Sequence, residues 1–295
     1  LLTAQGATRF TMISMLTGSI INIILDPIMI YALDWGIEGA AIATVISLGV
    51  NMALYIGYIA TKQGVLRLSL RNIRLSPQLL GEILKIGIPT LIFQILTSLS
   101  IGMINSAAKE YGGSALAAMG PVTKIMSMGT LIVFGFLKGF QPIAGFSYGA
   151  KKFDRLRDAI KTAILWSTIF CVIFGLVSAV FPTQIVSLFT KEDAEMVRVG
   201  SVALRANGLS FVLFGFYTVY SFLFLVMGKA TEGCILGACR QGICFIPVIL
   251  VLPTVWGLNG VLYAQPIADV ISAIVTATMA VRLHRELQRT EKLLQ

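Results

Sequence analysis

Long apolar stretches dominate the chain, and each is long enough to cross a lipid bilayer as a helix. A transmembrane helix needs about 20 consecutive apolar residues, and eight stretches of the sequence meet this length. The pattern therefore predicts an all-α integral membrane protein, a polytopic helical bundle with about eight transmembrane helices. The eight stretches are residues 10–32, 38–60, 83–108, 118–146, 160–182, 199–227, 233–252 and 257–281.

Composition agrees with this fold class and excludes a water-soluble protein. Hydrophobic residues make up 56% of the 295 residues and charged residues only 13%, whereas a soluble domain carries roughly 25% charged residues. The formal net charge of +9 would suggest a nucleic-acid partner in a soluble protein. Because the positive residues here lie between apolar stretches, membrane topology explains them better, and we expect no nucleic-acid partner.

The basic residues separate onto the two sides of the predicted membrane. Successive connections between the stretches lie on alternate sides of the membrane. On one of these two sides the connections contain only Lys109, Lys191 and Arg198 as basic residues. Cytoplasmic loops of membrane proteins are enriched in Lys and Arg, so the other side is predicted to be cytoplasmic, with both ends of the chain. Its basic residues are Arg9, Lys62, Arg67, Arg71, Arg74, Lys151, Lys152, Arg155, Arg157, Lys229, Arg282, Arg285, Arg289 and Lys292.

The longest connection divides the chain into two groups of helices. Residues 61–82 are basic and are predicted to form a cytoplasmic linker, either close to lipid headgroups or as a solvated loop. The predicted organisation is two helices in residues 1–60, the linker, six helices in residues 83–282, and a basic cytoplasmic tail in residues 283–295.

Two hairpins of the sequence repeat each other at an offset of 221 residues. Trp35-Gly36 aligns with Trp256-Gly257, Gly39 aligns with Gly260, and Ala43 aligns with Ala264. Internal repeats are a mark of transporter folds, whose binding sites lie at the interface between the repeats. The offset implies that the repeat partner of the third stretch precedes Leu1. Since the chain also starts without Met, we expect a truncated chain that lacks four helices.

Several motifs resemble one family of transporters. Residues 135–159 read GFLKGFQPIAGFSYGAKKFDRLRDA, where Ser147 replaces a usual Asn, and further matches are LDPIMIYALDWGIEGAAIATVIS at 25–47, KIGIPT at 85–90 and MGKAT at 227–231. Together they cover nearly the whole chain. On these residues the chain resembles a MATE (multidrug and toxic compound extrusion) transporter, in particular the MepA-type branch of bacterial exporters.

The resemblance implies a twelve-helix fold with two six-helix lobes around a central cavity, of which this chain holds the last two helices of the first lobe and all of the second. It implies a secondary active exporter of cationic or amphipathic drugs, working by alternating access against H⁺ or Na⁺, with no other cofactor. We expect a monomer in the bacterial cytoplasmic membrane, with small-molecule drugs and the bilayer as its partners.

One acidic residue stands out inside the first predicted helix. Asp26 follows Asn22 by four residues, so both lie on one helix face, and Pro27 disrupts the local backbone hydrogen bonding. Asp26 and Thr44 lie nine residues on either side of Trp35, so they are level in an antiparallel pair, roughly 12–14 Å from the turn. We predict that Asn22, Asp26 and Thr44 bind one H⁺ or Na⁺, because an intramembrane carboxyl group is a functional hypothesis by default. A role in capping a helix break, or in packing against Asn22, stays open.

The resemblance implies the same trio, together with an Asp from the family's first helix, which would precede Leu1. The second copy of the repeat does not preserve it, since Gln265 stands at the position of Thr44 and Ile246, with one residue of slippage from the offset, stands at that of Asp26. Another branch of the family places a Glu where this chain has Thr97. This argues against a Na⁺ site in the second lobe.

Other polar residues are predicted to face the substrate cavity of the second lobe. Lys138 and Asp269 lie inside apolar stretches, and contact with substrate is one interpretation; a snorkelling Lys138, or a structural pair of Lys138 with Asp269, is the other. The predicted cavity residues are Gln94, Asn105, Lys138, Gln141 and Asp269.

Other functions fit the sequence less well. A lipid-precursor flippase of the same superfamily would need several Arg residues in the cavity, but only Arg205 and Arg240 lie in the stretches, near their ends. An integral-membrane enzyme needs clustered acid, base or metal residues, which the loops lack. The four cysteines lie in apolar stretches and match no recognised zinc spacing, so no metal site is expected. The nucleotide-binding motif of an ATP-driven pump is also absent.

Overall fold

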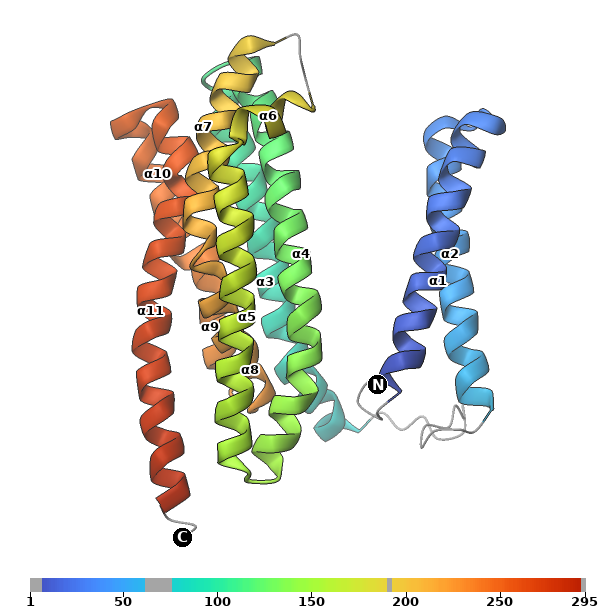
Figure 1. Cartoon of the computed structure of the whole chain (residues 1–295), viewed down its shortest axis with the longest axis vertical. Coiled ribbons are helices and arrows are strands. Elements are labelled where there is room, and N and C mark those ends of the chain that lie inside the picture. The colour runs from blue at the N-terminus through green and yellow to red at the C-terminus, as the bar shows by residue number, and fades with distance from the viewer. Residues whose placement is uncertain (1–6, 62–75, 190–192, 293–295) are drawn as a thin grey trace. The chain divides into compact units, whose positions relative to one another are not determined.

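The computed structural model describes residues 7–61, 76–189 and 193–292, and every element in these ranges is helical (Figure 1). The chain divides into two compact units, Leu1–Ser76 and Pro77–Gln295. We call their described parts the N-terminal hairpin and the C-terminal bundle. Most of the predicted linker, residues 62–75, lies outside the described residues, and residues 77–82 already belong to the first helix of the bundle.

The N-terminal hairpin consists of α1 (Thr8–Pro27), a π-helical segment η2 (Ile28–Ala32) and α2 (Gly36–Ala60). Pro27 lies where the hydrogen-bond pattern of α1 widens to that of η2. The reversal into α2 follows, with Asp34 and Gly36 in left-handed backbone conformations at φ of 54° and 52°. Asn, Asp and Gly are the residues that tolerate this conformation best.

The C-terminal bundle contains the remaining helices. Glycines with positive φ lie in the turns before three of them, because Gly112, Gly228 and Gly257 let the chain reverse where other residues would be strained. The elements are α3 (Pro77–Lys109), α4 (Gly113–Gly149), α5 (Phe153–Val180), α6 (Pro182–Ser187), α7 (Ala194–Phe211), α8 (Phe214–Val226), α9 (Ala230–Ala238), the π-helical η4 (Cys239–Ile243), α10 (Phe245–Trp256) and α11 (Leu258–Lys292).

The predicted spans correspond to helices of the structure. Seven helical segments of the described residues are long and apolar enough to cross a membrane. The predicted span 199–227 is instead a bent pair, α7 and α8, whose axes differ by 53°. Counted as one span, this pair gives eight, and the prediction of a polytopic helical membrane bundle is confirmed. Large apolar side chains stay exposed along these helices, among them Leu131, Trp166 and Leu250, as expected for surfaces that face lipid.

The sequence repeat has a structural counterpart in the two hairpin turns. Gly36 and Gly257, which align in the repeat, both adopt positive φ, at 52° and 58°. Three residues later, Gly39 and Gly260 each allow the second helix to approach the first. A Cβ atom added at Gly39 would lie 2.7 Å from the Met29 carbonyl oxygen, and one at Gly260 would lie 2.3 Å from the Leu252 carbonyl oxygen. The repeated glycines therefore serve the same purpose in both hairpins.

Packing inside the bundle is closest where small residues face each other. A Cβ atom at Gly175 of α5 would lie 2.4 Å from the Gly208 carbonyl oxygen of α7, so these two helices touch through their backbones, as small residues permit in membranes. Around this crossing lie two buried apolar clusters, one including Leu137, Phe211 and Phe214 and the other including Val186 and Phe245. Residues of α7 belong to both clusters, Phe211 to the first and Leu204 to the second.

Candidate transport sites

The N-terminal hairpin brings two of the three predicted cation ligands together. The Asn22 Nδ2 atom donates a hydrogen bond to Asp26 Oδ1 at 3.2 Å, and both side chains are half-buried. Thr44 lies on α2, where its exposed hydroxyl donates to the Ala40 carbonyl oxygen at 2.9 Å. A hydroxyl that donates in this way keeps its lone pairs available as acceptors for a cation. The carboxylate of Asp26 thus has one hydrogen-bond donor among the described residues.

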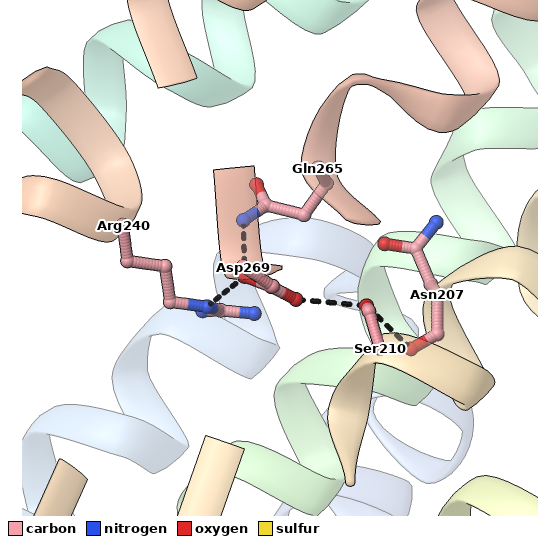
Figure 2. Close-up of polar contacts among 5 residues, drawn as sticks. All are labelled: Asn207, Ser210, Arg240, Gln265 and Asp269. Atoms are coloured by element: carbon pink, nitrogen blue, oxygen red, sulfur yellow. Dashed lines mark hydrogen bonds and ion pairs between the residues drawn. The ribbon is translucent and has the colours of Figure 1, made fainter. Parts of the chain in front are cut away.

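A second carboxylate lies in a more complete polar centre inside the C-terminal bundle. The side chain of Asp269, on α11, is buried, with only 1% of its residue surface exposed. Its Oδ1 atom accepts hydrogen bonds from Arg240 Nε at 3.0 Å and Gln265 Nε2 at 2.9 Å. Its Oδ2 atom accepts one from Ser210 Oγ at 2.9 Å. Figure 2 shows these three donors converging on the carboxylate from α7, η4 and α11.

Arg240 is the cation of this centre. It lies on η4, the π-helical segment between α9 and α10, and π-helical turns are frequent at functional sites. Its guanidinium carbon is 4.8 Å from the centre of the Phe214 ring, which adds a cation–π contact to the ion pair with Asp269. An isolated buried charge is strongly unfavourable, so such a pair is stable only when its hydrogen bonds are also satisfied. The Asp269 carboxylate meets this condition, because both of its oxygen atoms accept hydrogen bonds.

Sequence reasoning missed the role of Arg240. The expectation that Arg240 lies near the end of a span is wrong, because the span runs over Ala230–Trp256 and Arg240 is well inside it. One signal was present in the sequence: Gln265 precedes Asp269 by four residues, the same amide–carboxylate spacing as Asn22 and Asp26. The partner of Asp269 in the structure is Arg240, whereas Lys138 is exposed on α4 and forms no ion pair within the described ranges.

The other predicted cavity residues lie on α3 and α4. Gln94 and Asn105 are exposed on α3, and Gln141 is half-buried on α4. Asn105 lines a groove of about 620 Å³ between these two helices, together with a lysine, Lys124, that the sequence analysis did not single out. The groove residues are Ile101, Asn105, Gly120, Thr123, Lys124, Ser127, Met128, Leu131 and Ile132.

Comparison with known proteins assigns the chain to a family. The family model MatE matches residues 89–251, more than half of the chain. This chain belongs to the MatE family. It is 31% identical over 292 residues to the multidrug export protein MepA of Staphylococcus saprophyticus, and 32% identical over 288 residues to MepA of Staphylococcus aureus strain COL. These alignments cover 97% and 96% of the chain but only 63% and 62% of the relatives.

Solved structures of the MatE family share the fold. A MATE crystal structure in the bent conformation superposes with a TM-score of 0.83 at 26% identity, covering 95% of this chain and 63% of that one. An outward-facing multidrug resistance MATE transporter of the MOP superfamily gives 0.84 at 26% identity, with 94% and 63% covered. The chain thus spans a little under two thirds of its relatives. The match supports a multi-pass protein of the bacterial cytoplasmic membrane, in a family of transporters rather than enzymes.

Proposed function

We propose that this protein exports cationic or amphipathic small molecules by alternating access, in exchange for H⁺ or Na⁺ bound at Asp26. The observation that carries the proposal is the Asn22–Asp26 pair, a carboxylate inside a membrane-spanning helix with one amide donor and no built-in cation among the described residues. Intramembrane carboxylates of this kind mark ion pathways.

The chemistry of the hairpin suits either ion. A carboxylate inside a membrane-spanning helix can itself accept a proton, which is the chemistry that H⁺ coupling at Asp26 requires. A hard cation such as Na⁺ prefers several oxygen ligands, by analogy with Ca²⁺ and Mg²⁺. The Asp26 carboxylate, the Asn22 amide oxygen and the Thr44 hydroxyl offer that kind of ligand. Substrate contact by Gln94, Asn105, Lys138 and Gln141 stays part of the proposal.

The alternative of a lipid-precursor flippase has less support. A pyrophosphate group needs arginines that are free to bind it. Arg240 is neutralised by Asp269 within the bundle, and Arg205 is exposed and donates to the Ala179 carbonyl oxygen at 3.3 Å. Within the described residues, Arg240 is therefore not free to bind a pyrophosphate, which leaves Arg205 alone where several arginines are needed.

The test is dye export from proteoliposomes that contain the purified protein, energised in turn by a proton gradient and by a Na⁺ gradient. We expect Asp26→Asn to abolish export driven by the effective ion while equilibrium binding of the dye persists, because Asn keeps the shape of the side chain and loses its charge. The ion whose gradient drives export in the parent protein is the coupling ion.

Asp34→Asn is the matched control. Asp34 is an exposed carboxylate of the same hairpin, its φ of 54° is tolerated by Asn, and it lies at the turn rather than in a helix. Export by Asp34→Asn should equal that of the parent protein. Gradient-driven export that survives in Asp26→Asn would overturn the proposal.

A further inference from the structure

A pocket of about 570 Å³ lies on the exposed side of α7, and we call it the α7 pocket. Two arginines of α7, Arg198 and Arg205, line it, together with hydroxyl groups from three helices, Thr183 of α6, Ser201 of α7 and Tyr263 of α11. None of its lining residues is acidic. Figure 1 shows α6, the first turns of α7 and the α10–α11 turn at the same end of the bundle.

Arg205 shows how deep in the membrane the α7 pocket lies. Its Nε atom donates a hydrogen bond to the carbonyl oxygen of Ala179 at 3.3 Å, and Ala179 is the second-last residue of α5. Because α5 is a membrane span that ends at Val180, this contact places the guanidinium close to the boundary of the hydrocarbon core. One turn further along α7, Leu209 also lines the pocket and is 59% exposed. The exposed side of α7 thus changes from basic to apolar at this depth.

The α7 pocket contains a positive charge that the described residues do not neutralise. Arg198 is paired with Glu195, to which its Nε and Nη2 atoms donate at 3.0 and 2.7 Å. Arg205 forms no ion pair within the described ranges, and its contact with Ala179 uses one of the five N–H donors of a guanidinium. An arginine beside hydrocarbon is unfavourable without a polar partner, and its paired N–H groups match the oxygen atoms of a phosphate.

The surroundings of the pocket favour a phospholipid as the source of this phosphate. Leu209 of α7 is exposed, and so are Val270 and Ile274 of α11. These two follow Tyr263 by seven and eleven residues, so they lie on the same helix face. Tyr263 also lines a neighbouring pocket with Trp256, and Tyr and Trp are enriched where a membrane meets water. Acyl chains therefore have an apolar surface directly beside the site for the phosphate.

We propose that the α7 pocket binds the headgroup of an anionic phospholipid. The phosphate lies at Arg205, the hydroxyl groups of Thr183 and Tyr263 donate to it, and the acyl chains lie along the exposed apolar side chains of α7 and α11. A zwitterionic headgroup carries a cation of its own that competes with Arg205 for the phosphate, so the pocket prefers a lipid with a net negative charge. The lipid is a bound partner of the bundle and not cargo, and the inference is independent of the proposed function.

Trp256 provides a local reporter of lipid binding, because it lines the pocket that shares Tyr263 with the α7 pocket. Bromine atoms on an acyl chain quench the fluorescence of a tryptophan that the chain contacts. The chain has three tryptophans, so Trp35→Phe combined with Trp166→Phe leaves Trp256 as the single reporter. The purified protein is reconstituted into mixed vesicles in which either phosphatidylglycerol or phosphatidylcholine is brominated. Quenching then gives the binding constant of phosphatidylglycerol relative to phosphatidylcholine at this site.

Phosphatidylglycerol should bind beside Trp256 about fivefold more tightly than phosphatidylcholine, the factor expected for one arginine near a membrane surface. Arg205→Gln should reduce this relative constant to about one, whereas Arg205→Lys keeps the charge and should keep the preference. Val202→Glu adds a negative charge to the pocket lining and leaves the contact between Arg205 and α5 in place. It should also remove the preference, and it decides the matter if Arg205→Gln fails to fold.

A protein with Trp166 as its single tryptophan is the matched control. Trp166 is 58% exposed on α5 and lies outside the α7 pocket, so the relative constant there should stay near one in every variant. An equal preference at Trp166 and Trp256 would assign the effect to general attraction and overturn the proposal. A preference at Trp256 that survives in a folded Arg205→Gln or in Val202→Glu would overturn it as well.

Glycerol phosphate separates a lipid from a soluble anion, because it carries the same phosphate without acyl chains. Added in the millimolar range to the parent protein in mixed vesicles, it should leave the preference for phosphatidylglycerol at Trp256 unchanged. If glycerol phosphate abolishes the preference, the α7 pocket binds a soluble phosphate and the assignment to a lipid is wrong.

Discussion

Asp26 in the N-terminal hairpin and Asp269 in the C-terminal bundle are both carboxylates inside membrane-spanning helices, but their surroundings differ. Asp26 is half-buried and, among the described residues, accepts one hydrogen bond, from Asn22. Asp269 is almost fully buried and accepts three, including one from the guanidinium of Arg240. Both have an amide partner four residues earlier on the same helix, so the difference lies in the cation that tertiary packing supplies.

The comparison separates two uses of an intramembrane carboxylate. Where a fixed cation is built in, as at Asp269, the site is neutral and holds the helices of the bundle together. Where none is built in, as at Asp26 within the hairpin, the carboxylate is available to an ion from solution. Gln265, which donates to Asp269, stands at the repeat position of Thr44. The two copies of the sequence repeat therefore carry different chemistry at related positions.

The largest expected effect is that of removing the built-in cation. Arg240→Ala leaves Asp269 buried without its charged partner, and breaking a buried pair in this way destabilises a protein by about 3–5 kcal/mol. The measurement is thermal or denaturant unfolding of the purified protein in detergent. Asp26→Asn, with one partner to lose, should change the unfolding free energy by less than about 1 kcal/mol.

A double variant checks the cause. Arg240→Met combined with Asp269→Leu removes both charges and keeps an apolar interior, so it should recover most of the stability that Arg240→Ala loses. If Arg240→Ala is as stable as the parent protein, the ion pair does not hold the bundle together and the contrast with Asp26 disappears.

An intermediate effect is expected at the glycines that close the two hairpins. A methyl group at Gly260 would lie 2.3 Å from a backbone carbonyl oxygen, and one at Gly39 would lie 2.7 Å from another. Overpacking of this kind destabilises by about 1–3 kcal/mol, and Gly260→Ala should be the more damaging of the two. Unfolding midpoints of the purified variants provide the measurement.

Gly102→Ala is the control for this pair, because a Cβ atom there meets nothing within 4 Å. In a helix interior this change should stabilise slightly, by up to about 1 kcal/mol. Equal midpoints for Gly39→Ala, Gly260→Ala and Gly102→Ala would contradict the close approach described for both hairpins.

The smallest effect is expected for a carboxylate outside the membrane-spanning segments. Asp193 is the N-cap of α7, and the hydrogen bond from the Met196 amide, followed by one from Ser114, lowers the pKa of its carboxyl group below the ordinary value. A lowered pKa stabilises the folded state above the ordinary value near pH 4, and this contribution is lost as the pH falls through the folded-state pKa.

Asp193→Ala should therefore lower the unfolding midpoint slightly at pH 7, and the difference should vanish in strongly acidic buffer. Asp193→Asn, which keeps an N-cap acceptor, should lose less at pH 7. A difference between parent and Asp193→Ala that grows on acidification would contradict this sign.

Much of the fold can be predicted from the local pattern of apolar residues. The bend between α7 and α8 is a feature that this pattern does not predict. The stretch 199–227 is long and apolar enough to predict one span, but the structure bends it by 53° between Phe211 and Phe214. The bend occurs beside Gly215, where a Cβ atom would lie 2.9 Å from the Ser167 backbone of α5. A contact with another helix accompanies the bend, so span length alone does not reveal it.

The candidate sites divide in the same way. The Asn22–Asp26 contact joins residues four apart on one helix, and helical geometry alone predicts it. The Arg240–Asp269 pair joins η4 to α11, and the Lys124 groove needs two helices in register. Neither can be deduced from spacing along the chain, because the rotation of each helix about its axis decides which side chains meet.

The sequence by itself determined that the chain crosses a bilayer about eight times, where its hairpins turn and that it resembles an exporter family. These properties depend on apolar length, on glycine and on local motifs, which act within single segments and are set by the thickness of the bilayer. Only the tertiary structure decided which intramembrane charges are neutralised. Arg240 forms an ion pair with Asp269 of another helix, whereas Lys124 lines a groove between α3 and α4. The packing of the helices causes this difference. An electrostatic interaction in a low-dielectric interior depends on the distance between the charged groups, and packing sets the distance between side chains of different helices.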